Sequence, residues 1–205
     1  MTTAATGAGY DPQTDHQLMI LVARGNLKAM SEVYEHRHRS LFRFFFRLTG
    51  RQAASEDLVH EVFLRMIRYR HTYEGASGFE AWMYRIARNA LTDSAKKHRL
   101  ESPADEGQME QVASGRPTQL ESMVKEQELA LLHKAMRALP EDKRELLVLS
   151  RFQGLSYEEI GRIVGCETGT VKVRVFRAVK AMGQIFCQLR AGQLHAGQVR
   201  EEKAS

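Results

Sequence analysis

Cysteine is scarce in this 205-residue chain, which has only Cys166 and Cys187. Two cysteines make neither a disulfide framework nor a zinc-ligand set, and we expect Cys166 to be a small buried residue. The sequence also has no apolar run long enough to span a bilayer or to form a signal peptide. These absences exclude membrane insertion and predict a cytoplasmic protein.

Motifs of catalysis are absent as well. The sequence contains no His-Glu-x-x-His, no phosphate-cradling glycine loop and no nucleophile with an evident base. His36 and His38 alternate with Arg37 and Arg39, whose positive charges would oppose metal binding, so we expect this segment to be a solvated face. We therefore expect no enzymatic activity, metal, cofactor or small-molecule substrate.

Acidic residues are missing from a long C-terminal stretch, since Thr168 to Arg200 contains no Asp or Glu. The whole chain has a net charge of +5, which indicates a polyanionic partner without identifying it. The segment that leads into the acid-free stretch carries helix-turn-helix signals. Ser156 and Glu159 form a capping box, and Gly165 suits a left-handed helix end. Thr168 or Thr170 can cap the second helix.

The second helix of this motif has two unlike sides at 3.6 residues per turn. We expect the inward side to consist of Val171, Val175, Ala178, Val179 and Met182. The outward side and its flanks then carry Thr170, Lys172, Val173, Arg174, Phe176, Arg177 and Lys180. Arg177 is the best candidate for a bidentate guanine contact, and Val173 or Phe176 for a thymine methyl. The alternative is a solvated basic face, but turn, caps and charge together favour a DNA-reading helix.

Helical periodicity dominates the rest of the chain, with almost no strand signal, so we predict an all-α protein. It should comprise two small helical domains joined by a flexible acidic linker, the C-terminal one a helix-turn-helix. The expected segments are a disordered N-terminus at 1–14, a helical domain at 15–100, the linker at 101–128, the second domain at 129–187 and a mobile tail at 188–205.

Two helices of the first domain show surface patterns of interest. One, near residues 55–69, should turn Asp57, Glu61 and Leu64 away from the core. This face indicates either a docking surface for a cationic partner or a solvated face on which Arg65 and Arg68 offset Glu61, and the pattern alone favours the second.

A later helix should begin at a second capping box, Ser77 to Glu80, and bury Trp82 as a core anchor. Its outer side would carry Tyr84, Arg85 and Arg88, with Asn89 and Lys96 at the edge. The preceding loop, 69–76, mixes aromatic and cationic residues. Such a loop could hold unstacked bases, although the composition also fits an ordinary connection between helices.

Four segments taken together resemble the extracytoplasmic-function (ECF) group of bacterial sigma factors. They are Asp57-Leu58-Val59-His60-Glu61-Val62-Phe63-Leu64-Arg65, Phe79-Glu80-Ala81-Trp82-Met83-Tyr84-Arg85-Ile86-Ala87-Arg88-Asn89, Leu139-Pro140, and Gly169-Thr170-Val171-Lys172-Val173-Arg174. The resemblance covers residues 15–99 and 129–185 in the expected order. It implies a promoter-recognition subunit that binds RNA polymerase core and promoter DNA, with an anti-sigma factor as a further partner.

The resemblance also implies site residues. Polymerase would be bound through Asp57, His60, Glu61 and Leu64. The −10 promoter element would be held by Tyr73, Tyr84, Arg85, Arg88, Asn89 and Lys96. The −35 element would be read by the outward residues of the helix-turn-helix named above. The family usually has Gln in place of His60 and a small polar residue in place of Val173. The alternative function is a one-component helix-turn-helix regulator that acts without polymerase core.

Overall fold

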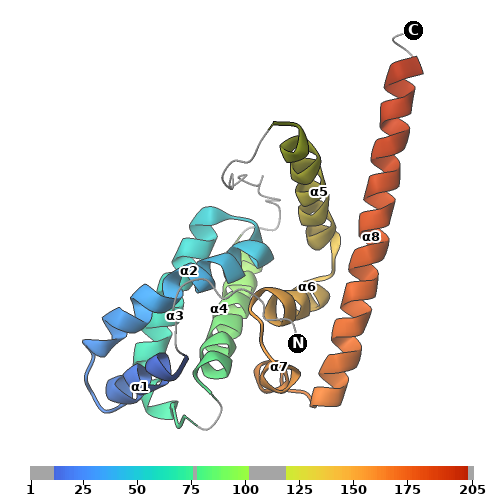
Figure 1. The fold of residues 1–205 in the computed structure, drawn as a ribbon. Coiled ribbons are helices and arrows are strands. Elements are labelled where there is room, and N and C mark those ends of the chain that lie inside the picture. The colour runs from blue at the N-terminus through green and yellow to red at the C-terminus, as the bar shows by residue number, and fades with distance from the viewer. Residues whose placement is uncertain (1–11, 76–77, 102–118, 203–205) are drawn as a thin grey trace.

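A computed structural model describes the backbone of residues 12–75, 78–101 and 119–202, with side chains for 14–75, 78–97 and 128–192. Over these residues the chain is helical, without a strand, which confirms the all-α prediction. Figure 1 shows two groups of helices, α1–α4 and α5–α8, and the long helix α8 lies on the side of the second group that faces away from α1–α3.

The first group contains four α-helices and a short 3₁₀ turn. They are α1 (Pro12–Ala23), α2 (Ala29–Thr49), α3 (Gln52–Arg68), η1 (Arg70–Thr72) and α4 (Phe79–Glu101). Gly50 ends α2 in the left-handed conformation, with φ of 70°, and its N–H donates to the carbonyl of Phe46. The predicted cap residue Ser77 lies outside the described residues.

Aromatic residues of α2 and α4 fill the core of this group. Phe44 and Phe45 are completely buried, as the crowded aromatic pattern of α2 suggested. Trp82 is also buried, and its Nε1 donates to Thr72 Oγ1 at 3.3 Å. Its predicted role as a core anchor is confirmed.

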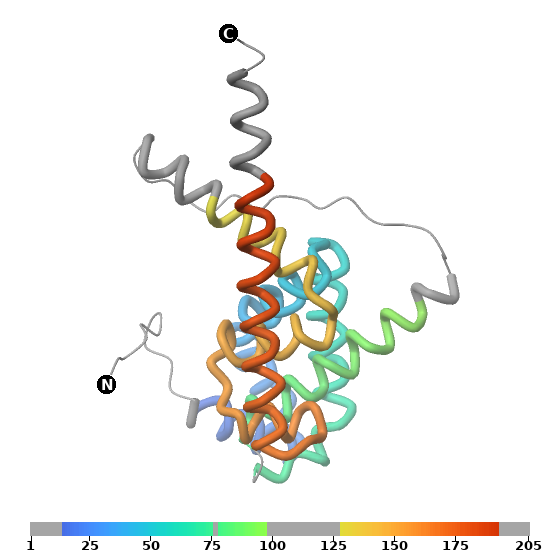
Figure 2. The backbone as a smooth tube through the Cα atoms, turned by 90° about the vertical axis from the view of Figure 1, so that its right-hand side faces the viewer, coloured from blue at the N-terminus to red at the C-terminus, as the bar shows by residue number. Residues whose placement is uncertain are grey.

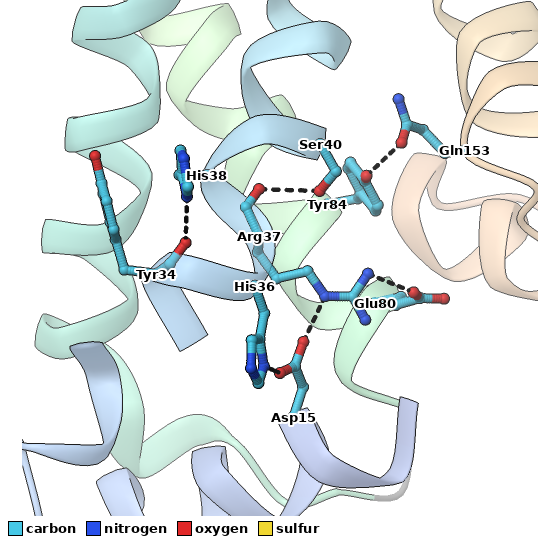
Figure 3. Close-up of polar contacts among 9 residues, drawn as sticks. All are labelled: Asp15, Tyr34, His36, Arg37, His38, Ser40, Glu80, Tyr84 and Gln153. Carbon is cyan, nitrogen blue, oxygen red and sulfur yellow. Dashed lines mark hydrogen bonds and ion pairs between the residues drawn. The ribbon is translucent and has the colours of Figure 1, made fainter. Parts of the chain in front are cut away.

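Charged residues are also buried in this group of helices, in a segment where a solvated face was expected. Arg37 is only 7% exposed. Its Nε donates to Asp15 Oδ2 at 2.5 Å and its Nη1 to Glu80 Oε1 at 2.7 Å, and His36 Nδ1 lies 2.8 Å from Asp15 Oδ1 (Figure 3). The expectation was therefore wrong for Arg37, because the carboxylates that pair with it come from α1 and α4, whereas His36 and Arg39 are exposed as expected. The network ties three helices together.

The second group carries the helix-turn-helix. Its elements are α5 (Gln119–Ala138), α6 (Glu141–Leu147), the π-helical turn η2 (Val148–Phe152), α7 (Tyr157–Val164) and α8 (Thr168–Glu202). Helix α8 packs against α5, α6 and α7. In Figure 2 it passes in front of the other helices.

The expected segment boundaries differ from the helix ends. Helix α5 begins at Gln119, so the last ten residues of the predicted linker are helical, and residues 102–118 lie outside the described part. Helix α1 begins at Pro12, inside the predicted N-terminal tail, and α8 continues to Glu202 through the predicted C-terminal tail. The C-terminal stretch prolongs the helical period of α8, which composition alone did not reveal.

The two groups of helices share one core. Helix α4 packs against α7, and α2 packs against α6 and η2. Buried apolar residues of both groups, among them Phe44, Tyr84 and Leu149, belong to a single connected cluster. The chain thus has two helical units that meet along α4.

We predict that Asp15→Ala lowers the free energy of unfolding by about 3 kcal/mol, because it takes a carboxylate from the buried Arg37 guanidinium. Denaturant unfolding of the full chain, followed by circular dichroism, measures the loss. Glu35→Ala, at an exposed position of α2, serves as the control and should stay within about 0.5 kcal/mol of the wild type. Equal, small effects of the two substitutions would contradict a structural role for the ion network.

Candidate nucleic-acid interface

The helix-turn-helix is built from local interactions that the sequence predicted. Ser156 Oγ accepts from the Glu159 N–H at 3.2 Å, and Glu159 Oε2 accepts from the Ser156 N–H at 2.8 Å. Gly165 ends α7 with φ of 73°, and its N–H donates to the carbonyl of Gly161 at 2.9 Å. The capping box and the glycine turn are therefore confirmed. Helix α8 already includes Thr168, so neither Thr168 nor Thr170 occupies the position before its first residue.

Gly161 has a role that the sequence analysis missed. Its carbonyl also accepts from the Cys166 N–H at 3.0 Å, and a Cβ at this glycine would lie 2.6 Å from the Cys166 carbonyl oxygen. Only glycine allows this close approach of α7 to the turn. A glycine inside an otherwise amphipathic helix was the available signal.

The inner side of α8 follows the prediction with one correction. Val171, Val175 and Ala178 are buried, and Met182 is half-buried. Val179 is 42% exposed, because it lies about 100° around the helix from Ala178 and so leaves the buried stripe.

The outer side of α8 is open in the structure. Six of the predicted residues are exposed, namely Thr170, Lys172, Val173, Phe176, Arg177 and Lys180. Arg174 is half-buried, and its Nη2 lies 3.9 Å from Asp142 Oδ2. Phe176 is 69% exposed, so the face combines cations with a large apolar side chain. Cys166, in the turn, is half-buried and not buried as expected.

A second candidate surface lies between α3 and α4. Arg85, Asn89 and Lys96 are exposed on α4. Asn89 and Lys96 line a cavity of about 350 Å³, whose other lining residues are Arg65, Tyr69, Ile86, Thr92 and Asp93. The structure therefore brings two of the predicted −10 residues together with a partly exposed tyrosine. The aromatic composition of the 69–76 loop could have identified Tyr69, but the predicted −10 contact from this loop was Tyr73.

Tyr73 is not available on this surface. It is buried, with its hydroxyl 2.6 Å from His16 Nδ1 and its ring 5.2 Å from that of Trp82. Burial raises the pKa of Tyr73 to about 12. Its prediction as an exposed DNA contact was wrong, because α1 packs over the loop that carries it.

Tyr84 is also buried, at 2% exposure, where an outward side chain was expected. Its ring centroid lies 5.1 Å from that of Phe44, and its hydroxyl donates to Gln153 Oε1 at 2.6 Å (Figure 3). Burial raises the pKa of the hydroxyl above its ordinary value. The periodicity of α4 alone could not reveal that Gln153, the residue after η2, contacts this side of the helix.

Arg88 is half-buried and faces the second helix group. Its Nε donates to Glu145 Oε1 at 3.0 Å. Burial raises the pKa of Glu145, while the Arg88 charge acts in the opposite direction. Arg88 is therefore turned toward α6, and Asn89 and Lys96 toward the cavity beside α3.

The predicted docking face of α3 is exposed apart from Glu61. Asp57 and His60 are open to solvent, and Leu64 is 61% exposed. Glu61 Oε1 accepts from Arg65 Nε at 2.6 Å. Arg65 thus offsets Glu61 as the sequence suggested, and its Nη1 also donates to Asp93 Oδ2 at 2.8 Å.

No group of three or more His, Cys, Asp or Glu is placed to hold a metal ion among the side chains that the structure describes. Within that part of the chain, no helix is both long and apolar enough to cross a membrane.

Comparison with known proteins identifies the family. Residues 33–101 match Sigma-70 region 2, and residues 129–182 match Sigma-70, region 4. The chain is 32% identical over 185 residues to the ECF RNA polymerase sigma-E factor of Escherichia coli (strain K12), across 82% of this chain and 92% of that protein. This chain belongs to the ECF group of sigma-70 family sigma factors. The region 2 match ends with α4, and the region 4 match begins within α5, contains α6, η2 and α7, and ends within α8.

Two further proteins are similar. The ECF RNA polymerase sigma factor EcfG of Rhodopseudomonas palustris (strain TIE-1) is 34% identical over 139 residues, which cover 68% of this chain and 75% of that protein. The sigma factor RpoE of Bartonella quintana, solved with the anti-sigma factor NepR, superimposes with a TM-score of 0.61 at 29% identity, over 77% of this chain and 96% of that one.

We predict that Gly161→Ala destabilises region 4 by about 1–3 kcal/mol, since its Cβ would meet a backbone oxygen that cannot move away without breaking the turn. Thermal unfolding of the full chain measures the loss. Gly183→Ala, in the interior of α8 with open space around its Cα, is the matched control and should stabilise the chain by up to about 1 kcal/mol. The same sign of effect at both glycines would argue against the tight turn.

Proposed function

We propose that this sigma factor reads the −35 promoter element with the exposed face of α8 and holds the −10 element on α4. The observation that carries the proposal is the acid-free outer side of α8, which follows a tightly held helix-turn-helix turn and leaves six of its seven predicted contact residues exposed. Such a helix fits the major groove of B-DNA. The work of this chain is transcription initiation together with RNA polymerase, and we place it in the cytoplasm on that ground.

The residues of α8 divide into base-reading and backbone-contacting groups. Arg177 is exposed and can present two N–H donors to the O6 and N7 acceptors of guanine. Val173 and Phe176 offer apolar surface to thymine methyl groups. Lys172 lies at the edge of this face and Lys180 farther along the helix, and both suit phosphate oxygens, which fix the position of the helix without reading sequence.

The cavity between α3 and α4 is proposed as the −10 contact. Tyr69 is exposed at its rim and offers an aromatic face on which an unstacked base can stack. Asn89 can hydrogen-bond a base edge, and Lys96 can meet the backbone phosphate. We propose Tyr69 in place of the buried Tyr73 for the stacking role.

The face of α3 formed by Asp57, His60 and Leu64 is the proposed polymerase contact. Leu64 supplies the exposed apolar centre and Asp57 an exposed carboxylate at its side, a combination that suits a partner with a basic rim. An anti-sigma factor is proposed as a second partner, since the similar sigma factor from Bartonella quintana was solved with one.

We predict that Leu64→Ala weakens binding to RNA polymerase core by more than about 1 kcal/mol, because truncating an apolar residue at the centre of an interface commonly costs that much. Fluorescence anisotropy of the labelled chain, titrated with purified core, measures the affinity. Leu27→Ala, at a similarly exposed leucine between α1 and α2, should leave binding unchanged.

Purified RNA polymerase core and the full chain also test the proposed role in transcription initiation. Core plus the wild-type chain should initiate at members of a broad promoter library, and core alone should not. Tight operator binding by the free chain as a dimer, with no initiation in the presence of core, would instead support a one-component regulator.

We further predict that Arg177→Ala and Lys180→Ala weaken promoter binding in different ways. Arg177→Ala should cost about 1–3 kcal/mol on the preferred sequence and relax discrimination at one base pair. Lys180→Ala should weaken binding to all sequences alike, since it removes a phosphate contact. Binding of holoenzyme to promoters with single substitutions in the −35 element separates the two. Losses independent of sequence for both variants would refute the role of Arg177.

A further inference from the structure

Helix α1 contacts both the start of α4 and the connection that leads into it from α3. The helix precedes the residues that match Sigma-70 region 2. Its Asp15 pairs with Arg37, which pairs in turn with Glu80 in the first turn of α4. Its next residue is His16, whose Nδ1 lies 2.6 Å from the hydroxyl of Tyr73 in the connection. Two consecutive residues of α1 therefore act on neighbouring parts of the chain.

His16 packs closely on the connection as well as bonding to it. Its ring meets that of Tyr73 edge-on, with the two centroids 5.8 Å apart. Gly75 has a φ of 79°, and a Cβ at this glycine would lie 2.7 Å from His16 Cε1. The imidazole thus fills the space that a side chain at Gly75 would need. The fit of α1 on the connection depends on this one side chain at two points.

Contacts continue from Tyr73 back to Tyr69, the residue at the rim of the cavity between α3 and α4. The Tyr73 ring lies 5.2 Å from that of Trp82, whose Nε1 donates to Thr72 Oγ1 at 3.3 Å. Thr72 Oγ1 donates in turn to the carbonyl of Tyr69 at 2.8 Å, and the Thr72 N–H donates to the same carbonyl at 2.9 Å. Because these groups are closely packed, a shift of Tyr73 would displace the backbone of Tyr69.

We propose that His16 is a positioning residue for the −10 contact, because it holds Tyr73 against Trp82 and so keeps Tyr69 placed to stack on an unpaired base. The proposal rests on the proposed function of the cavity and adds a residue of α1 that shapes it. His16 acts through Tyr73 and needs no contact with DNA. A contact residue that is already ordered binds more tightly, since less conformational entropy is lost on binding.

Trp82 reports on this arrangement without DNA, because it is the single tryptophan of the chain and is buried beside Tyr73. His16→Ala should shift its fluorescence emission to longer wavelength, since water reaches the indole once Tyr73 is released. His16→Asn keeps a polar atom near the position of Nδ1 and has a similar helix propensity, so it should keep the wild-type emission. Wild-type emission in His16→Ala, or an equal shift in His16→Asn, would overturn the hold on Tyr73.

Two further variants complete the fluorescence test. Tyr73→Phe removes only the hydroxyl, so it serves if His16→Ala fails to fold, and it should shift the emission in the same direction. His38→Ala is the matched control, since it removes another His–Tyr contact of the same helix group, the ring stack on Tyr34. It should leave the emission unchanged. An unshifted Tyr73→Phe would overturn the role of the hydrogen bond.

Binding of holoenzyme to DNA tests the positioning itself. The probe is a promoter that initiates in the library test, with its −10 element kept unpaired by mismatches. Tyr69→Ala should weaken binding about tenfold, because it removes the stacking surface. His16→Ala should weaken it about fivefold, which corresponds to the loss of one buried hydrogen bond. His16→Asn and His38→Ala should each stay within about twofold of the wild type, since neither releases Tyr73.

The double variant His16→Ala with Tyr69→Ala separates positioning from a general loss of stability. It should bind as Tyr69→Ala alone does, because His16 can act on the −10 strand only while Tyr69 is present. Losses that multiply, or wild-type binding by His16→Ala, would overturn the positioning role and leave the contact by Tyr69 intact. Wild-type binding by Tyr69→Ala would instead refute the proposed −10 contact, and the positioning role with it.

Discussion

Helix α4 packs against both groups of helices at once, and most of the structure depends on that constraint. Its first turn is held by the ion pair between Glu80 and the buried Arg37, which also binds Asp15 of α1. A buried guanidinium with carboxylates from two other helices fixes their relative placement, since moving any of them would leave charge unpaired in a low-dielectric environment. The rotation of α4 about its own axis is set in this way.

Once that rotation is set, the direction of each side chain of α4 is also set, because successive side chains are separated by about 100° around a helix. Trp82 enters the core of region 2, and Tyr84 and Arg88 face region 4. Asn89 and Lys96 line the cavity beside α3. A single helix therefore carries a core anchor, an interface between regions and a proposed DNA contact.

The parts of the site that sequence could predict are those made by near neighbours. Three features depend on residues only a few positions apart, so the sequence pattern predicts them. They are the Ser156–Glu159 capping box, the left-handed Gly165 and the exposure of Arg177. Tyr73 and Arg37 were misjudged because their partners, His16 and Asp15, lie on another helix. Periodicity tells which side of a helix is apolar, but it cannot show which polar residue a distant element will cover.

The two helices with proposed promoter contacts are therefore unequal in the packed molecule. The outer side of α8 faces away from region 2, and six of its seven proposed contact residues are exposed, whereas α4 has Tyr84 and Arg88 held by region 4. A face that needs no rearrangement can meet duplex DNA as soon as the chain approaches it. A face that must first be released meets DNA only after an additional step, and single-stranded DNA is available only once the duplex has opened. On the proposed roles, the packing of region 4 on α4 matches the order in which duplex and melted DNA become available during initiation.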